Sequence, residues 1–501
     1  MTYQLYKPLR NHLRSYSTLQ SLAVIRAYIQ NLQFDEPFPT DIEVNPVFLR
    51  ADNANKGVYE WELELLIREV IINCEEVGKY DMRNYTHFAS AVNKLKQLEN
   101  SIGASPAYRE IFKENVLQEL FRISHRQFHW QQKPNTDDLI RYYKIFGRTD
   151  LDAIVESELG MNARQLYTLG LVLTGAYSDK FGIRYPIRIE MEGILTQAQS
   201  DEFIRRFSIG ITELKEKMER AQSYDQDFAY TMNPLLLTPL VWVILDGVKT
   251  LIAPVPTYIL KRFTEGIYYE ICNAEGFSAA FGSSFQEYVG DVLKATTGNT
   301  DVHISPEQNY RVGKNVKHSV DWIMEDATAT IFIECKTKRV RYAGKLALSD
   351  TASIDEDLKK MADFIVQVYK TLTDALQGSY AHWQPSERPI YPMVVLLEEW
   401  YLFGDRVIAI IDRFVKDKLN EENLDLGMVD EYPYSICSVK DLEYTAAVLA
   451  KVGIQSYMET KNNDEYRNWS HGSYTNSNYF KEASARPDLF PDTAQALGIN
   501  D

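Results

Sequence analysis

Cysteine is scarce in this chain of 501 residues. The four cysteines are widely separated and none belongs to a C-x-x-C motif, so the sequence offers neither a disulfide framework nor a zinc-binding pair. This pattern is typical of a cytoplasmic protein with reduced thiols. Long apolar runs are also missing, because the most apolar stretch, Pro234–Leu245, is interrupted by Thr238 and Pro239. A membrane helix needs roughly 18 consecutive apolar residues, so we expect no contact with a membrane.

Several common catalytic motifs are absent as well. Gly313-Lys314 lacks the upstream glycine of a phosphate-binding loop, and no serine stands in a G-x-S-x-G motif. His125 and His129 have the spacing of a helical metal pair, but Arg126 stands where a metalloprotease carries its catalytic glutamate. The sequence therefore gives no support to ATP hydrolysis, serine-dependent hydrolysis or zinc-dependent proteolysis.

Basic charge is in the minority overall, yet it is concentrated in one window. The formal net charge of −16 repels nucleic acid. Residues 311–345, however, contain eight basic and four acidic side chains, which makes this window +4. Such a patch suits contact with phosphates, although an ordinary solvated strand end has the same composition. The basic candidates for nucleic-acid contact are Lys314, Lys317, Lys338, Arg339, Arg341 and Lys345.

Helical periodicity dominates the first half of the chain. Apolar residues recur at helical spacing, which predicts helices that include Tyr108–Phe121, Asp137–Ile145, Ala163–Leu173 and Asp201–Arg220. Further along, Asp246-Gly247 between two apolar runs predicts a β-hairpin. A helix around Arg262–Cys272 is expected to follow it.

These patterns divide the chain into four expected segments. Residues 1–230 form a mostly helical domain for recognition or regulation, and residues 231–280 contain the hairpin and its connecting helix. Residues 281–460 form a domain with both helices and strands. Residues 461–501 are polar and weakly periodic, so we expect a C-terminal tail whose aromatic side chains dock onto the fold.

The most informative stretch of the chain combines two acids and a lysine. Asp321 lies in one short apolar run, and Glu334-Cys335-Lys336 ends the next, with a turn predicted at residues 325–328. Side chains alternate along a strand, so Glu334 and Lys336 share one face, and Asp321 of the paired strand lies beside them. Such a group suits a divalent cation with oxygen ligands. The alternative is a cross-strand salt bridge without a catalytic role.

The D-x12-E-x-K pattern resembles the core of the PD-(D/E)XK, or restriction-endonuclease-like, nuclease superfamily. Val320 stands where this family often carries a proline. The expected helix that precedes the motif, Phe281–Leu293, contains Glu287, at a place where the family often has a further metal-site carboxylate. The elements expected after the motif also follow the family's order: a helix near Ile354–Leu376, a strand at Ile390–Leu397, a helix near Arg406–Lys418 and a strand at Tyr434–Val439.

This resemblance implies an α+β fold and a set of site residues. A large N-terminal helical region would precede a restriction-endonuclease-like α/β core, in which helices flank a mixed central sheet. The implied ligands of Mg²⁺ or Mn²⁺ are Asp321, Glu334, the carbonyl group of Cys335 and Glu287. Lys336 would position the attacking water, and Gln367 would lie near the scissile phosphate.

The implied activity is a metal-dependent endonuclease that hydrolyses phosphodiester bonds. The resemblance favours DNA over RNA as substrate, and defence of a bacterium against foreign DNA as the setting. A homodimer, or a partner protein bound through the helical domain, is compatible with this activity. Two alternatives stay open at this point: a non-catalytic nuclease-fold scaffold or binding subunit, and an RNA-directed nuclease.

Overall fold

The computed structural model describes residues 2–49, 57–131, 135–298, 300–340, 351–402 and 404–499. This part of the chain forms two compact units. The first unit covers most of residues 1–274, and the second combines residues 144–151 with most of the chain from Glu275 onward. The predicted hairpin and the helical turns that follow it therefore belong to the first unit instead of forming a segment of their own.

The first unit is built mainly from helices whose apolar faces meet in one core, where the rings of Tyr28 and Phe88 stack 3.9 Å apart. The helices of this part of the chain are α1 (Thr2–Leu13), α2 (Thr18–Phe34), η1 (Pro46–Leu49), α3 (Glu60–Asn73), α4 (Tyr85–Gly103), α5 (Pro106–Glu114), α6 (Val116–Gln131), α7 (Thr136–Phe146), α8 (Thr149–Leu159), α9 (Ala163–Asp179), α10 (Gln197–Phe207), α11 (Ile211–Ala221), η2 (Phe228–Tyr230), η3 (Pro234–Leu236), α12 (Thr257–Phe263) and α13 (Ile267–Ile271).

A four-stranded sheet completes the first unit. Its strands are β1 (Gly182–Arg184), β2 (Ser208–Gly210), β3 (Leu240–Leu245) and β4 (Val248–Ile252), in the order β1-β4-β3-β2. The predicted hairpin is confirmed as β3–β4. Its two turn residues, Asp246 and Gly247, have φ angles of 51° and 75°, which Asp-Gly turns tolerate.

Three predicted helices are each divided in two. The expected helix at 108–121 is broken between α5 and α6, and the one at 262–272 between α12 and α13. The expected helix at 201–220 is interrupted by β2, which pairs in parallel with β3. This pairing partner lies some thirty residues further along the chain, so local periodicity does not reveal it.

The second unit contains a five-stranded sheet in the order β11-β10-β9-β8-β5. β5 (His303–Pro306), β8 (Trp322–Glu325) and β9 (Thr330–Lys336) are antiparallel neighbours, whereas β10 (Ile390–Leu396) and β11 (Ser435–Ser438) continue the sheet in parallel with β9. A separate two-stranded hairpin, β6 (Asn309–Val312) and β7 (Asn315–His318), lies between β5 and β8 in sequence. The helices of this unit are α14 (Phe277–Thr297), α16 (Thr351–Leu376), α17 (Asp405–Glu421), α18 (Met428–Glu431), α19 (Val439–Val452), α20 (Ile454–Lys461), α21 (His471–Asn478), α22 (Phe480–Ser484) and α23 (Pro491–Ala496).

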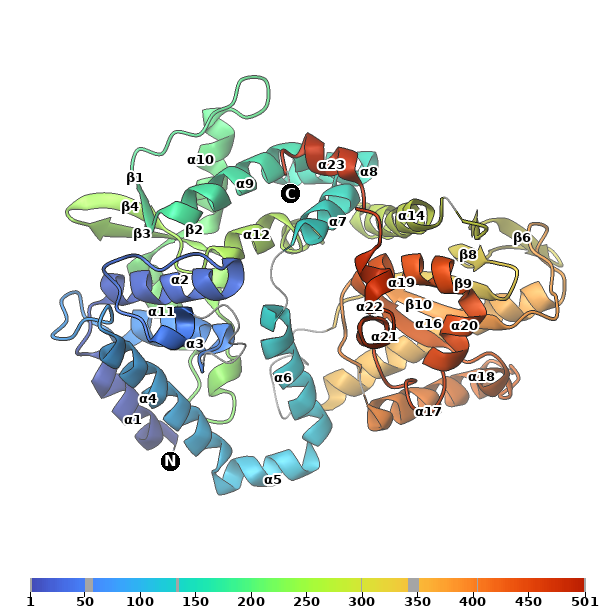
Figure 1. The fold of residues 1–501 in the computed structure, drawn as a ribbon, viewed down its shortest axis with the longest axis horizontal. Helices are drawn as coiled ribbons and strands as arrows, with labels where there is room; N and C mark the ends of the chain where they lie inside the picture. Colours follow the sequence, from blue (N-terminus) through green and yellow to red (C-terminus); the bar gives the residue numbers. More distant parts are fainter. Residues whose placement is uncertain are drawn as a thin grey trace. The chain divides into compact units, whose positions relative to one another are not determined.

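Helices cover both faces of this sheet (Figure 1). α14 and α19 pack together on one face, and α16 lies on the other face with α17 packed against it. The indole of Trp322 in β8 lies over Gly290 of α14, and Trp322 pairs with Ile333 of β9. Because side chains alternate along strands, Asp321 and Glu334 project from the opposite face, toward α16.

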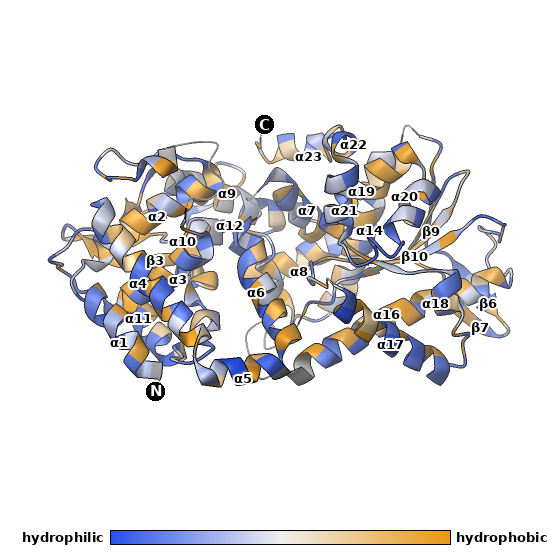
Figure 2. Cartoon of the chain, turned by 60° about the horizontal axis from the view of Figure 1, so that its bottom comes forward, coloured by the Kyte–Doolittle hydropathy of each residue, from blue (hydrophilic) through white to orange (hydrophobic). Residues whose placement is uncertain are grey.

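The amphipathic pattern of α16 explains how it covers the sheet. Along its length the buried side chains recur at intervals of three and four residues, namely Leu358, Met361, Ile365, Val368, Tyr369 and Leu372. Apolar and polar residues alternate around both α16 and α17 in Figure 2. The chain is thus a mixed α and β protein with mixed sheets. None of the helices in the described ranges is long and apolar enough to cross a membrane.

The segment that we expected to be a polar tail contains α21, α22 and α23. His471 and Tyr474 of α21 are buried, and α21 packs against α19. The ring of Tyr474 lies 5.1 Å from that of Tyr457 in α20. Tyr474 of this segment therefore docks onto the fold as expected, whereas Trp469 and Phe480 are exposed.

Substitution of one glycine tests the packing of α14 on β8. A Cβ atom added at Gly290 would stand 2.0 Å from the Trp322 ring, so Gly290→Ala forces the helix away from the sheet. We expect it to lower the free energy of unfolding by about 1–3 kcal/mol. Gly282→Ala on the same helix is the control, because nothing lies within 4 Å of its added Cβ atom. Urea unfolding measures both, and equal midpoints would contradict this packing.

Candidate functional site

The register of β8 and β9 brings two carboxyl groups together. Trp322 of β8 pairs with Ile333 of β9 in an antiparallel ladder. One step further along the ladder, Asp321 stands opposite Glu334. The Cβ atoms of residues that face each other in this way are about 5 Å apart.

The predicted turn between these strands is present and is held from two sides. Asp326 accepts hydrogen bonds from the backbone N–H groups of Thr328 at 2.7 Å and Ala329 at 2.9 Å. Its second carboxylate oxygen accepts the N–H of Ile454, the first residue of α20, at 2.8 Å. The turn is thereby anchored to a helix, which fixes the register of the two strands.

Lys336 and Gln367 form a hydrogen-bonded group around Glu334. The ammonium of Lys336 donates to Glu334 Oε1 at 2.6 Å and to the side-chain oxygen of Gln367 at 3.1 Å. Gln367, on α16, donates from its amide nitrogen to the same Glu334 oxygen at 2.7 Å. The structure therefore brings together Gln367 and both charged residues of the E-x-K motif.

Burial controls the protonation of the acidic pair. Only 4% of Glu334 is exposed, and desolvation raises the pKa of this carboxyl group, while the Lys336 ammonium acts in the opposite direction. Desolvation, and then repulsion by Glu334, raise the pKa of Asp321 to about 7. The two ionised carboxylates are therefore costly to hold together without further positive charge.

The backbone of Cys335 faces Asp321. Its N–H group donates to Asp321 Oδ2 at 2.6 Å. The N–H and C=O groups of one residue in a strand point toward the same neighbouring strand, so the Cys335 carbonyl lies on the Asp321 side. The thiol is different, because burial raises the pKa of Cys335 well above its usual value. Cys335 can therefore offer a carbonyl oxygen, and its thiol stays protonated.

A third carboxylate near the pair was not predicted. Glu307 follows β5, and its N–H group donates to the Asp321 carbonyl at 2.8 Å. After desolvation, the main cause, the charge of Glu307 also helps to raise the pKa of Asp321 and of Glu334. Gln286 of α14 donates to the Glu307 carboxylate at 2.9 Å. No motif marks Glu307 in the sequence, because β5 is short and carries no clear alternation.

Glu287 does not join this acidic group, contrary to our prediction. It lies on α14 and forms an ion pair with Arg148 at 3.1 Å, with 55% of its side chain exposed. The neighbouring Gln286 is the residue whose side chain reaches Glu307. Successive residues of a helix are about 100° apart, so the prediction selected the wrong neighbour on the helix.

The predicted basic patch is partly buried. Lys338 is exposed, and so is Lys314 in the turn between β6 and β7. Arg339 is only 7% exposed and forms an ion pair with Glu398 at 3.1 Å. This burial contradicts the expectation that Arg339 contacts nucleic acid, and it arises because the chain after β9 packs against the chain after β10.

The remaining basic candidates differ in their surroundings. Lys317 of β7 donates to Asp374 of α16 at 2.7 Å, so it ties the small hairpin to the main fold. Tyr310 donates to the same carboxylate at 2.6 Å. Lys317 thus has a structural partner in addition to any ligand. Arg341 and Lys345 lie outside the described residues.

The acidic pair provides the kind of donor atom that Mg²⁺ prefers. Asp321, Glu334 and the Cys335 carbonyl offer hard oxygen atoms, and the two carboxyl groups are desolvated. Over the described ranges, no group of three or more His, Cys, Asp or Glu side chains is arranged to hold a metal ion. Mg²⁺ commonly takes one or two carboxylates from a protein and completes its shell with water and substrate phosphates. The donor set therefore fits Mg²⁺ better than an all-protein calcium or zinc site.

Comparison with known proteins gives no assignment. No family model, no curated protein and no solved structure matches this chain. Its function has to follow from the chemistry of the site.

The raised pKa of Asp321 predicts a pH-dependent stability in metal-free solution. A carboxyl group with a folded-state pKa of about 7 binds a proton on folding, because its unfolded pKa is about 3.9. The contribution of this bound proton to the free energy of unfolding is fully present below about pH 4 and is lost as the pH rises through about 7. From pH 5 to 7 the free energy of unfolding of the wild type should fall more steeply with pH than that of Asp321→Asn. The two slopes should differ by roughly 1 kcal/mol per pH unit.

Urea unfolding in EDTA over this pH range measures the difference. Glu287→Gln is the control, and it should keep the wild-type pH dependence because its side chain faces Arg148. Parallel curves for the wild type and Asp321→Asn would contradict a desolvated acidic pair.

Proposed function

We propose that the second unit is a metal-dependent nuclease that hydrolyses phosphodiester bonds. The observation that carries this proposal is the group of Asp321, Glu334, Lys336 and Gln367, in which two desolvated carboxyl groups share one face of a sheet with an ammonium and an amide. A structural salt bridge needs one acid and one base. A second desolvated acid beside that bridge costs stability, which supports a functional reason for its presence.

Mg²⁺ or Mn²⁺ is the cofactor that the donor atoms suit. Asp321, Glu334 and the carbonyl of Cys335 would hold the ion, and Glu307 adds a further negative charge nearby. When bound, such an ion lowers the pKa of coordinated water and offsets negative charge on a phosphate group. Its positive charge would also relieve the repulsion between the two carboxylates.

Lys336 and Gln367 have complementary tasks in this proposal. Lys336 is held in one position by Glu334 and Gln367, so its ammonium is oriented before substrate arrives. From there it can orient a water molecule and stabilise negative charge on the phosphate in the transition state. Gln367 is exposed on α16, so it holds the lysine and is also accessible to a phosphate oxygen.

The order of elements in the second unit supports the same proposal. α14, the antiparallel strands β5, β8 and β9, the helix α16 and the parallel strand β10 follow the α-β-β-β-α-β order of the restriction-endonuclease-like core, with the β6–β7 hairpin inserted. We infer that DNA is the substrate and that defence against foreign DNA in the cytoplasm is the setting. The first unit would then select the substrate or bind a partner, which is either another protein or a second copy of this chain.

Near-isosteric variants test the assignment. Asp321→Asn, Glu334→Gln and Lys336→Met should each reduce Mg²⁺-dependent cleavage about 100-fold or more, because each removes a charge next to the reacting phosphate. Glu287→Gln, on an acid paired with Arg148, should cleave at nearly the wild-type rate. The assay compares supercoiled plasmid, linear duplex, single-stranded DNA and RNA with Mg²⁺, Mn²⁺ or EDTA.

Each pattern of results has a defined meaning. Full activity of Asp321→Asn or Glu334→Gln would refute the site. Cleavage of RNA alone would make the protein an RNA-directed nuclease. An absence of both cleavage and metal binding would favour the non-catalytic scaffold.

A further inference from the structure

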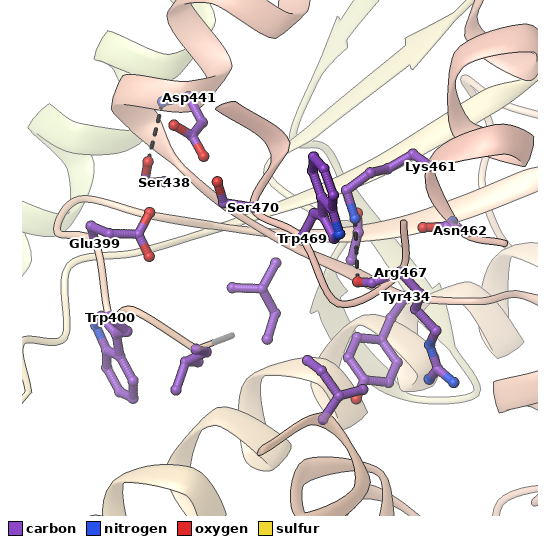
Figure 3. A pocket seen from close by; sticks show the side chains of 14 residues that line it. Glu399, Trp400, Tyr434, Ser438, Asp441, Lys461, Asn462, Arg467, Trp469 and Ser470 are labelled. Atoms are coloured by element: carbon purple, nitrogen blue, oxygen red, sulfur yellow. Dashed lines mark hydrogen bonds between the residues drawn. The ribbon is translucent and has the colours of Figure 1, made fainter. Parts of the chain in front are cut away.

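A pocket in the second unit lies at the carboxyl ends of β10 and β11 (Figure 3). Its volume is about 600 Å³ when the part that is open to solvent is counted. None of Asp321, Glu334, Lys336 and Gln367 lines it. The polar residues that line it make it a candidate ligand site that is distinct from the acidic pair.

One side of this pocket is acidic. Glu399, from the segment after β10, and Asp441, in the first turn of α19, both line it. Desolvation, and then the charge of Asp441, raise the pKa of Glu399 to about 7. Within the described part of the chain, Asp441 Oδ2 is buried and has no hydrogen-bond partner. A buried carboxylate oxygen without a donor is costly, so this side favours a ligand that brings N–H groups.

The other side carries positive charge and an aromatic ring (Figure 3). Lys461, at the end of α20, is 2% exposed, and its ammonium donates to the Arg467 carbonyl at 3.3 Å. The Arg467 guanidinium is already bound to both oxygens of Asp412, at 2.9 and 3.0 Å. An ammonium has three donors, so Lys461 can donate to a ligand as well. The Trp469 ring, 43% exposed, also lines this side.

Hydroxyl groups add to the polar lining. Ser435 of β11 is 6% exposed, and among the residues with described side chains its Oγ atom has no hydrogen-bond partner. Ser438 is the N-cap of α19, and its Oγ atom accepts the N–H of Asp441 at 3.1 Å. Ser470 lines the pocket too. The site thus combines acceptors, donors and an aromatic face within one small volume.

We propose that this pocket binds a nucleobase and that guanine fits its groups best. The Watson–Crick edge of guanine presents two adjacent N–H donors beside one carbonyl acceptor. A carboxylate accepts from both donors at once, and an ammonium or hydroxyl group donates to the carbonyl oxygen. Glu399 or Asp441 supplies the carboxylate, Lys461 supplies the donor, and Trp469 supplies a surface on which a base stacks.

Simpler ligands satisfy fewer of these groups. A bare metal ion would find two side-chain carboxylates but would offer no acceptor to Lys461. A small organic cation would satisfy the acids but would offer no acceptor to Lys461 or to the Ser435 hydroxyl. A planar molecule with both donors and an acceptor serves both sides of the pocket. This inference is independent of the proposed nuclease activity, because the two sites share no residue.

Ligand titration of the full chain tests the proposal. Guanosine, adenosine, cytidine and agmatine would be titrated in EDTA at about pH 8, above the pKa of about 7 of Glu399, with tryptophan fluorescence and calorimetry as readouts. Guanosine should bind at least about tenfold more tightly than the other nucleosides, because only its edge matches the carboxylate. Guanosine monophosphate and a single-stranded oligonucleotide with one guanine separate a free nucleotide from a polymer as the source of the base.

Variants of the lining connect the binding to this pocket. At least one of Glu399→Gln and Asp441→Asn should weaken guanosine binding about tenfold or more. Glu459→Gln is the matched control, since this exposed acid on α20 does not line the pocket, and it should stay within about twofold of the wild type. If a variant does not fold, the ranking of ligands by the wild type still decides. Binding of agmatine alone, equal binding of all nucleosides, or no binding would each overturn the proposal.

Discussion

The antiparallel register of β8 and β9 is the constraint on which the candidate site depends. It places Trp322 over Gly290 on one face of the sheet and Asp321 opposite Glu334 on the other. A slip of either strand by one residue would send its acid to the α14 face and separate the pair. Asp326 prevents this slip, because it closes the turn and binds the start of α20 at the same time. The packing of the core and the geometry of the site are therefore two consequences of one register.

Both sites of the second unit lie where parallel strands end. Glu334 and Lys336 are the last polar residues of β9, and the pocket opens beyond β10 and β11. In each site two desolvated carboxyl groups lie near a lysine. The difference is in the partners: Lys336 is bound to its acid at 2.6 Å, whereas Lys461 donates to a backbone carbonyl. The first arrangement suits a cation and a phosphate, and the second suits an uncharged ligand with both donors and acceptors.

Features that depend on residues close together in the sequence could be predicted. The turn at residues 325–328, the helix that carries Glu287 and the order of elements after Lys336 follow from turn residues and periodicity, and the structure contains all three. Asp321, Glu334 and Lys336 could be grouped because strand alternation and a short hairpin fix their relation. Gln367 could be proposed only through family resemblance, since its contact with Glu334 bridges 33 residues of sequence.

Features set by tertiary packing were not predictable. Glu307 reaches the site because β5 pairs with β8, and four residues of β5 give no periodic signal. Glu287 and Gln286 are neighbours on one helix, and only the position of Arg148 and Glu307 shows which side chain faces the site. Arg339 was expected to be a surface charge, but it is buried against Glu398.

The most direct test of the central claim is a titration with Mn²⁺ followed by electron paramagnetic resonance. We predict that the wild type and Glu287→Gln bind Mn²⁺ and that the double variant Asp321→Asn, Glu334→Gln does not. Equal binding by the double variant, or no binding by the wild type, would contradict the account.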